Sequence, residues 1–124
     1  MATETQTQIK AKETFHFINS PSEAINDALA GLTYLNPSLS YVREYKIIYR
    51  NDLASFSEDH VTTVGFAGGG HEPMFGGFVG HNYLSAYVSG TVFASPTAAQ
   101  IFEAIKMCQP QSGEGKGTLV VCGN

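Results

Sequence analysis

Residues 61–71, VTTVGFAGGGH, carry the strongest fold signal in the chain. Val61 to Phe66 is rich in β-branched and aromatic residues, which is typical of a β-strand. The run passes directly into Gly68-Gly69-Gly70-His71. Glycines after a strand allow the backbone to turn sharply or to approach a ligand closely. The stretch therefore predicts a strand over 61–66, a glycine turn, and a histidine on or just after that turn.

Two helices flank this stretch. Apolar residues recur at helical spacing over residues 21–35. The preceding residues 20–23, SPSE, have the pattern of a capping box with proline at the first helical position. Ser95-Pro96 repeats the pattern of a cap followed by a first helical residue. We therefore predict helices over 21–35 and from this second cap to about residue 107.

Further strands are predicted on both sides. Residues 42–50, VREYKIIYR, read as one strand followed by a turn at Asn51-Asp52. Residues 118–122, TLVVC, are continuously apolar, as in a strand that is covered on both faces. Strands that alternate with helices predict an α/β fold, a layered sheet with flanking helices, whose ligands bind beyond the carboxyl ends of the strands. If nothing covers residues 118–122, an apolar patch and a sheet edge are exposed, and the chain is expected to associate.

Composition bounds the class of protein. The chain has 124 residues, 43% apolar and 15% charged, which is enough for one domain and excludes a wholly disordered chain. No apolar run approaches the roughly 20 residues of a membrane helix. The net charge of −4, with no basic block, argues against nucleic acid or an anionic membrane as a partner. Residues 1–14 are polar and predict a disordered tail, which leaves 15–124 as the domain.

Cys108 and Cys122 form no C-x-x-C pair, and both lie in apolar stretches. We expect two buried free thiols, which are typical of a reducing compartment. The N-terminus has neither the basic start nor the apolar stretch of a secretory signal. These features together predict a cytoplasmic protein.

Motifs for nucleotides and metals are not found. The phosphate-loop pattern fails around Gly115-Lys116, and the dinucleotide pattern fails because Pro73 stands where its last glycine should be. A zinc-protease pattern after His71-Glu72 lacks its second histidine, so no metal site is predicted. The glycine run followed by His71 is the candidate that remains, since a histidine can exchange a proton near neutral pH. Ordinary tight turns and a structural histidine account for the same residues, and both interpretations stay open.

Several blocks together resemble the dihydroxyacetone kinase family, at the start of its substrate-binding domain. The resemblance covers residues 19–124, and its most specific blocks are G-H-E-P at 70–73 and F-A-S-P at 93–96. It implies phosphoryl transfer to dihydroxyacetone from ATP, or from a phosphocarrier protein in bacteria. It also implies that Gly68, Gly69, Gly70 and His71 bind the triose, with His71 as a catalytic residue that hydrogen-bonds a hydroxyl and transfers a proton. ATP and magnesium would sit on a separate helical domain of the full-length family.

The chain departs from the family pattern mainly around this site. The usual G-G-G-S-G before the histidine reads Phe66-Ala67-Gly68-Gly69-Gly70. Phe75 replaces a second histidine, Thr91 an acidic residue, and Gly123 a lysine. The family's activating aspartate and its covalent histidine would follow Asn124.

Two hypotheses follow from the match and the departures. The chain is either the N-terminal part of a dihydroxyacetone kinase or a truncated, non-catalytic relative. Such a relative would bind a triose weakly, form a homodimer or pair with a full-length kinase. In either case the 124 residues alone are expected to be inactive as a kinase.

Overall fold

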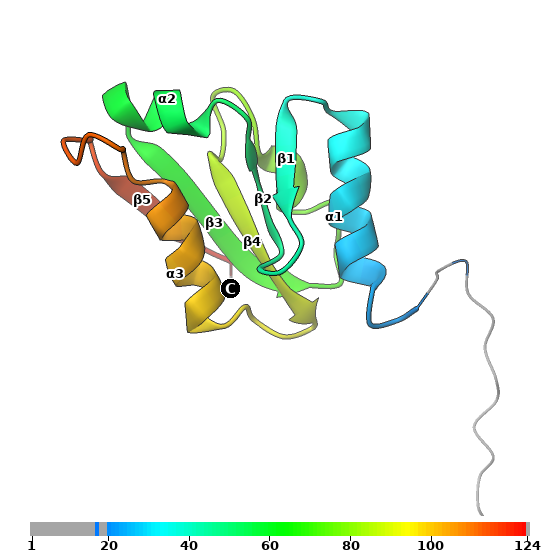
Figure 1. Ribbon diagram of the computed structural model, residues 1–124. Helices are drawn as coiled ribbons and strands as arrows, with labels where there is room; N and C mark the ends of the chain where they lie inside the picture. The colour runs from blue at the N-terminus through cyan, green and yellow to red at the C-terminus, as the bar shows by residue number, and fades with distance from the viewer. Residues whose placement is uncertain (1–16, 18–19, 124) are drawn as a thin grey trace, which may run out of the picture.

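The computed structural model describes residue 17 and residues 20–123, so the tail predicted over 1–14 lies outside the described residues. The predicted α/β layered sheet is confirmed (Figure 1). The elements are α1 (Ala24–Leu35), β1 (Leu39–Val42), β2 (Ile47–Arg50), α2 (Leu53–Asp59), β3 (Thr62–Gly69), the 3₁₀ helix η1 (Gly76–Phe78), β4 (Ala86–Val92), α3 (Ala98–Met107) and β5 (Thr118–Cys122).

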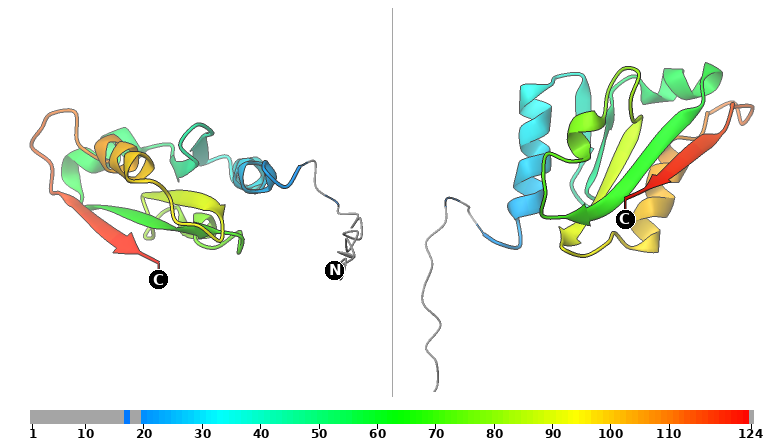
Figure 2. Two further views of the ribbon diagram at one scale, coloured as in Figure 1. Left: turned by 90° about the horizontal axis from the view of Figure 1, so that it is seen from below. Right: turned by 180° about the vertical axis from the view of Figure 1, so that it is seen from behind.

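The five strands form one mixed sheet in the order β1-β2-β4-β3-β5. β1 and β2 form an antiparallel hairpin, and β2 pairs antiparallel with β4. β3 lies at the parallel part of the sheet, between β4 and β5. The turned views in Figure 2 show β5 at one edge of the sheet, beside β3. The carboxyl ends of three parallel strands therefore meet at one end of the molecule.

The core has two halves, one on each face of the sheet. One half joins α1 and the η1 segment to the sheet, and it contains Ile25, Leu29, Leu39, Ile48, Ala67, Val79 and Tyr87. The other half lies under α2 and α3, and it contains Ile47, Leu53, Val64, Ala86, Val88, Ala104 and Cys108. Successive residues of β4 alternate between the two halves, as the pleat of a strand that is covered on both faces requires.

Both predicted helices begin later than expected. α1 starts at Ala24 rather than at residue 21, because residues 21–23 form a turn and Ser20 Oγ hydrogen-bonds Ser22 Oγ instead of capping the helix. α3 starts at Ala98, with Thr97 rather than Ser95 as the N-cap. Gln100 N donates to Thr97 Oγ1 (3.3 Å), and Thr97 N donates to Gln100 Oε1 (2.9 Å). This capping box satisfies two amide groups of the first turn and so fixes the start of α3.

The prediction of one strand over residues 42–50 is wrong. The chain reverses between β1 and β2 through Arg43–Lys46, where Lys46 has a φ of 52°. The turn at Asn51-Asp52 is confirmed, but it leads into α2, which was not predicted from the sequence. A helix of seven residues with two buried positions leaves too short an apolar repeat to detect.

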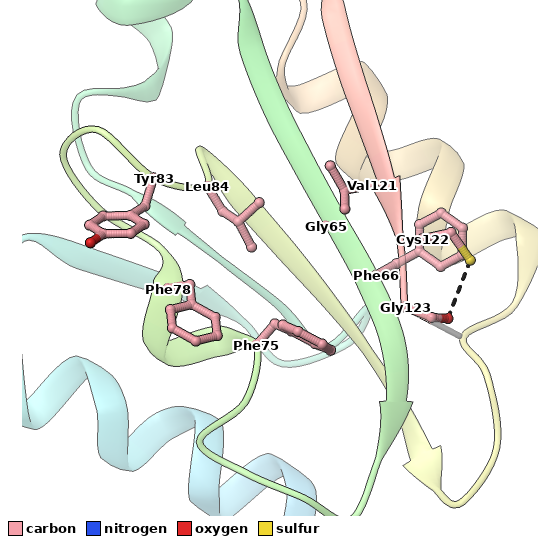
Figure 3. Close-up of a pocket in the computed structure, with 9 residues that line it drawn as sticks. All are labelled: Gly65, Phe66, Phe75, Phe78, Tyr83, Leu84, Val121, Cys122 and Gly123. Atoms are coloured by element: carbon pink, nitrogen blue, oxygen red, sulfur yellow. Dashed lines mark hydrogen bonds between the residues drawn. The ribbon is translucent and has the colours of Figure 1, made fainter.

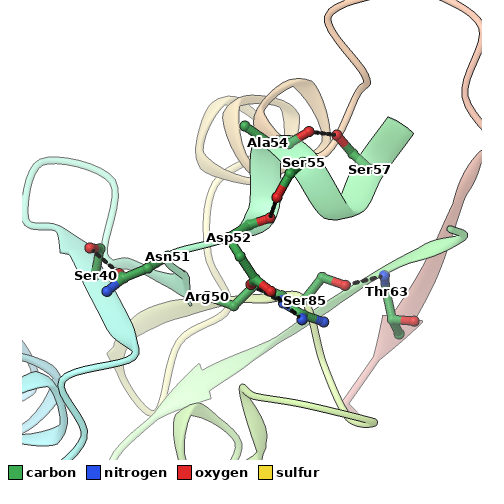
Figure 4. A network of polar contacts seen from close by, with 9 residues as sticks. All are labelled: Ser40, Arg50, Asn51, Asp52, Ala54, Ser55, Ser57, Thr63 and Ser85. Carbon is green, nitrogen blue, oxygen red and sulfur yellow. Dashed lines mark hydrogen bonds and ion pairs between the residues drawn. The ribbon is translucent and has the colours of Figure 1, made fainter. Parts of the chain in front are cut away.

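A buried arginine ties β2 to α2 (Figure 4). The Arg50 side chain donates from Nε to Asp52 Oδ1 (2.5 Å) and from Nη2 to Asp52 Oδ2 (2.7 Å), and its guanidinium lies 3.8 Å from the centroid of the Phe56 ring. The hydrogen bond from Arg50 lowers the pKa of Asp52 below its usual range. Ser85 Oγ nearby accepts a hydrogen bond from Thr63 N (3.1 Å), which fixes the chain before β4 against β3.

β5 is a strand, as predicted, but the expectation that it is covered on both faces is wrong. Leu119, Val120 and Val121 are 57%, 41% and 45% exposed. Among the described residues, β5 is therefore an exposed apolar strand at the edge of the sheet. This is the outcome expected if nothing covers residues 118–122. None of the described helices combines the length and the apolar composition that crossing a bilayer requires.

The two cysteines also differ from expectation. Both are free thiols, but only Cys108 is buried, while Cys122 at the end of β5 is exposed. Burial raises the pKa of Cys108 to about 11.

In the folded protein at neutral pH, we therefore expect Cys122 to react quickly with an alkylating reagent and Cys108 to be protected. Because the thiolate is the reactive form, Cys108 stays protonated and inert until the protein unfolds. Labelling with iodoacetamide, followed by peptide mass spectrometry, should modify Cys122 first and Cys108 only in denaturant. Equal labelling rates in the native protein would contradict this placement of Cys108.

Candidate active site at the carboxyl end of β3

His71 lies where the sequence predicts it, at the carboxyl end of β3, and its side chain is exposed. The preceding glycines differ from the prediction, because Gly68 and Gly69 are the last residues of β3 and not a turn. Only Gly70 leaves the extended conformation, with a φ of 108° that favours glycine. A proline after a possible cap at Glu72 would also suit the start of a helix, but no helix begins at Pro73, and turns lead from His71 to η1.

The end of β3 forms one wall of a hollow of about 450 Å³. Its lining comes from the end of β3, the turn that follows, the loop after β4 and the end of β5: Ala67, Gly68, Gly69, His71, Met74, Phe75, Phe93, Ala94, Ser95 and Gly123. Three of the four predicted site residues therefore line one hollow, and Gly70 lies between two of them in the chain. Phe93, Ala94 and Ser95 of the F-A-S-P block also line the hollow, and they were not predicted to belong to the site.

Close packing explains two of the glycines. A Cβ added at Gly68 would lie 3.3 Å from the carbonyl oxygen of Ala94. A Cβ at Gly69 would lie 2.8 Å from Cδ1 of Ile25, and the Gly69 carbonyl accepts a hydrogen bond from Phe93 N (2.8 Å). Gly68 thus lets the loop after β4 approach the end of β3, and Gly69 leaves room for Ile25 of α1.

Glu72 holds the backbone beside His71. Its Oε2 accepts a hydrogen bond from Gly70 N (2.9 Å), and its Oε1 accepts one from the buried Ser89 Oγ (3.4 Å). A carboxylate next to a histidine could orient the imidazole or cap a helix, but both oxygens of Glu72 make other hydrogen bonds. Glu72 instead joins the turn after β3 to β4, through a partner seventeen residues further along the chain.

The imidazole of His71 contacts aromatic rings at the edge of the core. The His71 and Phe75 rings meet edge to face, with centroids 5.8 Å apart. Phe75 in turn contacts the Tyr87 ring at 6.2 Å. The Tyr87 hydroxyl is buried and has no hydrogen-bond partner among the described residues, and burial raises its pKa. His71 thus sits at the boundary between the apolar core and solvent.

The other histidines lie elsewhere. His60 stacks on Phe56 with ring centroids 4.4 Å apart, and His81 lines a separate hollow beside Arg50. His16 is outside the described residues. Within the described part of the chain, no three His, Cys, Asp or Glu side chains gather closely enough to hold a metal ion.

The Dak1 domain family matches this sequence over residues 30–124. The chain belongs to the Dak1 domain family. The match takes in every strand of the sheet and every residue that lines the hollow. The resemblance to dihydroxyacetone kinases is therefore confirmed.

Individual Dak1 relatives support the same assignment. The chain is 41% identical over 108 residues to the dihydroxyacetone-binding subunit DhaK of a dihydroxyacetone kinase from Lactococcus lactis, covering 86% of this chain and 30% of the relative. It is 35% identical to the operon coactivator DhaQ of the same organism, covering 87% and 31%. The crystal structure of dihydroxyacetone kinase from C. freundii superposes with a TM-score of 0.72 at 28% identity, covering 87% and 20%. The chain thus spans less than a third of the length of these proteins.

Three departures from the dihydroxyacetone kinase pattern pack against one another. Ala67, Phe75 and Gly123 all line the hollow. A Cβ at Gly123 would lie 2.8 Å from Cβ of Ala67 and 3.2 Å from Cε2 of Phe75. A side chain at position 123, which the resemblance implies to be a lysine, would therefore crowd Ala67 first and Phe75 next. Ala67, Phe75 and Gly123 place no polar side chain on this side of the hollow.

Proposed function

We propose that this chain binds dihydroxyacetone or a related triose in the hollow at the end of β3, and that it does not transfer a phosphoryl group by itself. The observation that carries the proposal is the meeting of Gly68, Gly69 and His71 in one hollow beyond the carboxyl ends of parallel strands. This is the place in an α/β sheet where ligands usually bind. The similarity to a dihydroxyacetone-binding subunit supports a triose as the ligand.

The hollow suits a small polyhydroxy ligand. A triose offers hydroxyl groups that both donate and accept, and a carbonyl that accepts. The exposed His71 has one ring nitrogen that donates and one that accepts when the imidazole is neutral. His71 would thus bind a hydroxyl and hold or move its proton, while the backbone of the glycine run supplies further polar groups. Phe75 and Phe93 would shield the carbon chain of the ligand from water.

The described residues do not fit a complex of ATP with magnesium. The phosphate-loop pattern fails in the sequence, and no cluster of three acidic or histidine side chains is present among the described residues. The resemblance implies that ATP and magnesium bind to a separate helical domain of the full-length proteins. We therefore assign to this chain the triose site and no step of the phosphoryl transfer.

A non-catalytic relative that pairs with another chain is the second candidate. Two observations favour it. Ala67, Phe75 and Gly123 pack against one another at positions where the resemblance implies a glycine, a histidine and a lysine, and the chain is similar to the coactivator DhaQ. The partner would be a full-length kinase or a second copy of this chain. The two free thiols agree with a cytoplasmic location for such a pair.

Replacing His71 by alanine should weaken triose binding about 3- to 10-fold, which corresponds to the loss of one net hydrogen bond. Ligand-observed NMR with dihydroxyacetone would give the two dissociation constants. His81→Ala is the matched control, because His81 is also exposed but lines the separate hollow beside Arg50. Equal affinities for the wild type and His71→Ala, or no binding by the wild type, would contradict the proposed site.

A further inference from the structure

The turn that carries His71 leaves β3 at a residue with unusual backbone freedom. Gly70 is the first residue beyond β3, and its φ of 108° is a conformation that glycine adopts readily and other residues do not. Glycine also loses more conformational freedom on folding than any other residue, so Gly70 does not hold itself in this conformation. The neighbouring residues His71, Pro73 and Met74 are exposed. The position of His71 therefore depends on a contact that another residue supplies.

The far end of the same turn is held by apolar packing. Phe75, Phe78, Tyr83 and Leu84 line an apolar groove of about 390 Å³, and Figure 3 shows their side chains. The centroid of the Phe75 ring lies 6.2 Å from that of Tyr87 and 6.0 Å from that of Phe78. These contacts fix the chain from Phe75 onward, but they place no constraint on the backbone at the start of the turn.

Glu72 connects the start of the turn to the sheet. Among residues 70–74 it alone is not exposed. Its carboxylate accepts a hydrogen bond from Gly70 N (2.9 Å) and another from Ser89 Oγ (3.4 Å). Ser89 is completely buried in β4, and its own N donates to the Lys46 carbonyl (3.0 Å), so this anchor is part of the sheet. The carboxylate thus ties the amide of Gly70 to β4.

Neutral donors bind this carboxylate. Among the residues that the structure describes, no ion pair joins Glu72 to a cation. Tyr87 lies two residues before Ser89 and on the same face of β4; burial raises the pKa of its hydroxyl, and the charge of Glu72 raises it further. Hydrogen bonds to an ionised acceptor are about twice as strong as those between neutral groups. The charge of Glu72 therefore strengthens its bonds to Gly70 and Ser89.

We propose that Glu72 is a positioning residue of the triose site. Glu72 is not among the residues that line the hollow, and it acts by holding Gly70 in the conformation that places His71 there. Because the Gly70 amide is already bonded to Glu72, Gly70 contributes its conformation to the site and not a hydrogen bond to the ligand. The inference rests on the proposed function, since it is the binding of a triose that requires the turn to be held.

Replacing Glu72 separates this role from others. Glu72→Ala should weaken the binding of dihydroxyacetone about 10-fold, because only about one tenth of the molecules then hold the turn in the binding conformation. Glu72→Gln should bind within about 3-fold of the wild type, since its amide accepts from Gly70 N and donates to Ser89 Oγ. Ligand-observed NMR gives the three dissociation constants. A role of the negative charge toward the ligand itself would not be rescued by glutamine.

Glu58→Ala is the matched control. Glu58 is also half-buried and also accepts hydrogen bonds from backbone amides, those of Gln111 (2.8 Å) and Ser112 (3.3 Å), but none of these three residues lines the hollow. Its loss should lower the melting temperature about as much as Glu72→Ala does and leave the affinity for the triose unchanged. A merely structural role for Glu72 predicts instead that the two variants change the affinity equally.

Hydrogen exchange of the Gly70 amide tests the same contact without any ligand. Exchange should be about 10-fold faster in Glu72→Ala than in the wild type, and Glu58→Ala should not change it. Ser89→Ala keeps the test decisive if Glu72→Ala fails to fold, because it removes one buried hydroxyl and leaves the turn itself unaltered. It should weaken triose binding about 3-fold. In a chain that already carries Glu72→Ala it should have no further effect, since both substitutions break one connection.

The outcomes distinguish this inference from the proposed function. Protection of the Gly70 amide that persists in Glu72→Ala would overturn the inference and leave triose binding intact. An affinity that neither Glu72→Ala nor Ser89→Ala changes would do the same, as would a Glu72→Gln variant that binds as weakly as Glu72→Ala. A wild type that does not bind dihydroxyacetone would overturn the proposed function and, with it, the role of Glu72 in binding.

Discussion

The 124-residue chain, mixed with ATP, magnesium and dihydroxyacetone, is expected to produce no phosphorylated triose above background. Phosphoryl transfer depends on positioning and on stabilising charge at the transferred group. The described residues contain one exposed histidine at the hollow and no cluster of acidic or histidine side chains. A positioned acid or base contributes roughly 10² to 10⁴ in rate, so His71 alone would not produce measurable turnover.

The assay couples the product to an enzyme that detects the phosphorylated triose. A full-length dihydroxyacetone kinase serves as the positive control, and it shows that the coupling enzymes report the product. Turnover by this chain that disappears in His71→Ala would contradict the expectation and would require a nucleotide site among these residues. Turnover that persists in His71→Ala would indicate a contaminating kinase instead.

Gly90→Ala should destabilise the fold more than any other glycine-to-alanine substitution in the described part of the chain. Gly90 is buried in β4, and a Cβ there would lie 1.9 Å from the carbonyl oxygen of Ala94, with backbone atoms of Ser95 and Pro96 within 2.8 Å. Backbone cannot move aside as a flexible side chain can, so the loop after β4 must shift away from the end of β3. We expect the free energy of unfolding to fall by about 3 kcal/mol or more.

Thermal unfolding followed by circular dichroism would measure this loss as a fall in Tm of about 10 °C or more. Gly31→Ala is the matched control, because Gly31 lies in α1 and a Cβ there would meet nothing within 4 Å. Alanine should stabilise that helix by about 0.5 to 1 kcal/mol. A Gly90→Ala variant that melts at the wild-type temperature would show that the loop from Phe93 to Ser95 does not lie where the structure has it.

Regular repeats in the sequence predicted part of the fold, but they did not predict β4 in the middle of the sheet or the helix α2. The strand patterns at 61–66 and 118–122 and the two long helices are confirmed. The start of α3 was missed because Thr97 and Gln100 form a capping box that competes with the pattern at Ser95-Pro96. The reversal between β1 and β2 was missed because Lys46, and not a glycine, adopts the positive φ.

The site was predictable only where its residues are neighbours in the sequence. The position of His71 after β3 follows from the strand pattern and the glycine run. The hydrogen bond from Ser89 to Glu72 and the wall formed by Phe93 to Ser95 depend on the pairing of β3 with β4, which brings together residues about twenty positions apart. The exposure of β5 could not be predicted for a similar reason, because the sequence does not say which strands lie next to it.

Mapping backbone amide shifts while dihydroxyacetone is added to ¹⁵N-labelled protein would show whether the hollow at the end of β3 binds the triose. We expect the largest shifts on Gly68 to His71 and on Phe93 to Ser95, the two walls of the hollow. Shifts concentrated at Phe78 and Tyr83 in the apolar groove, or around Arg50 and His81, would place the ligand elsewhere. The absence of any shift at high triose concentration would contradict triose binding by this chain.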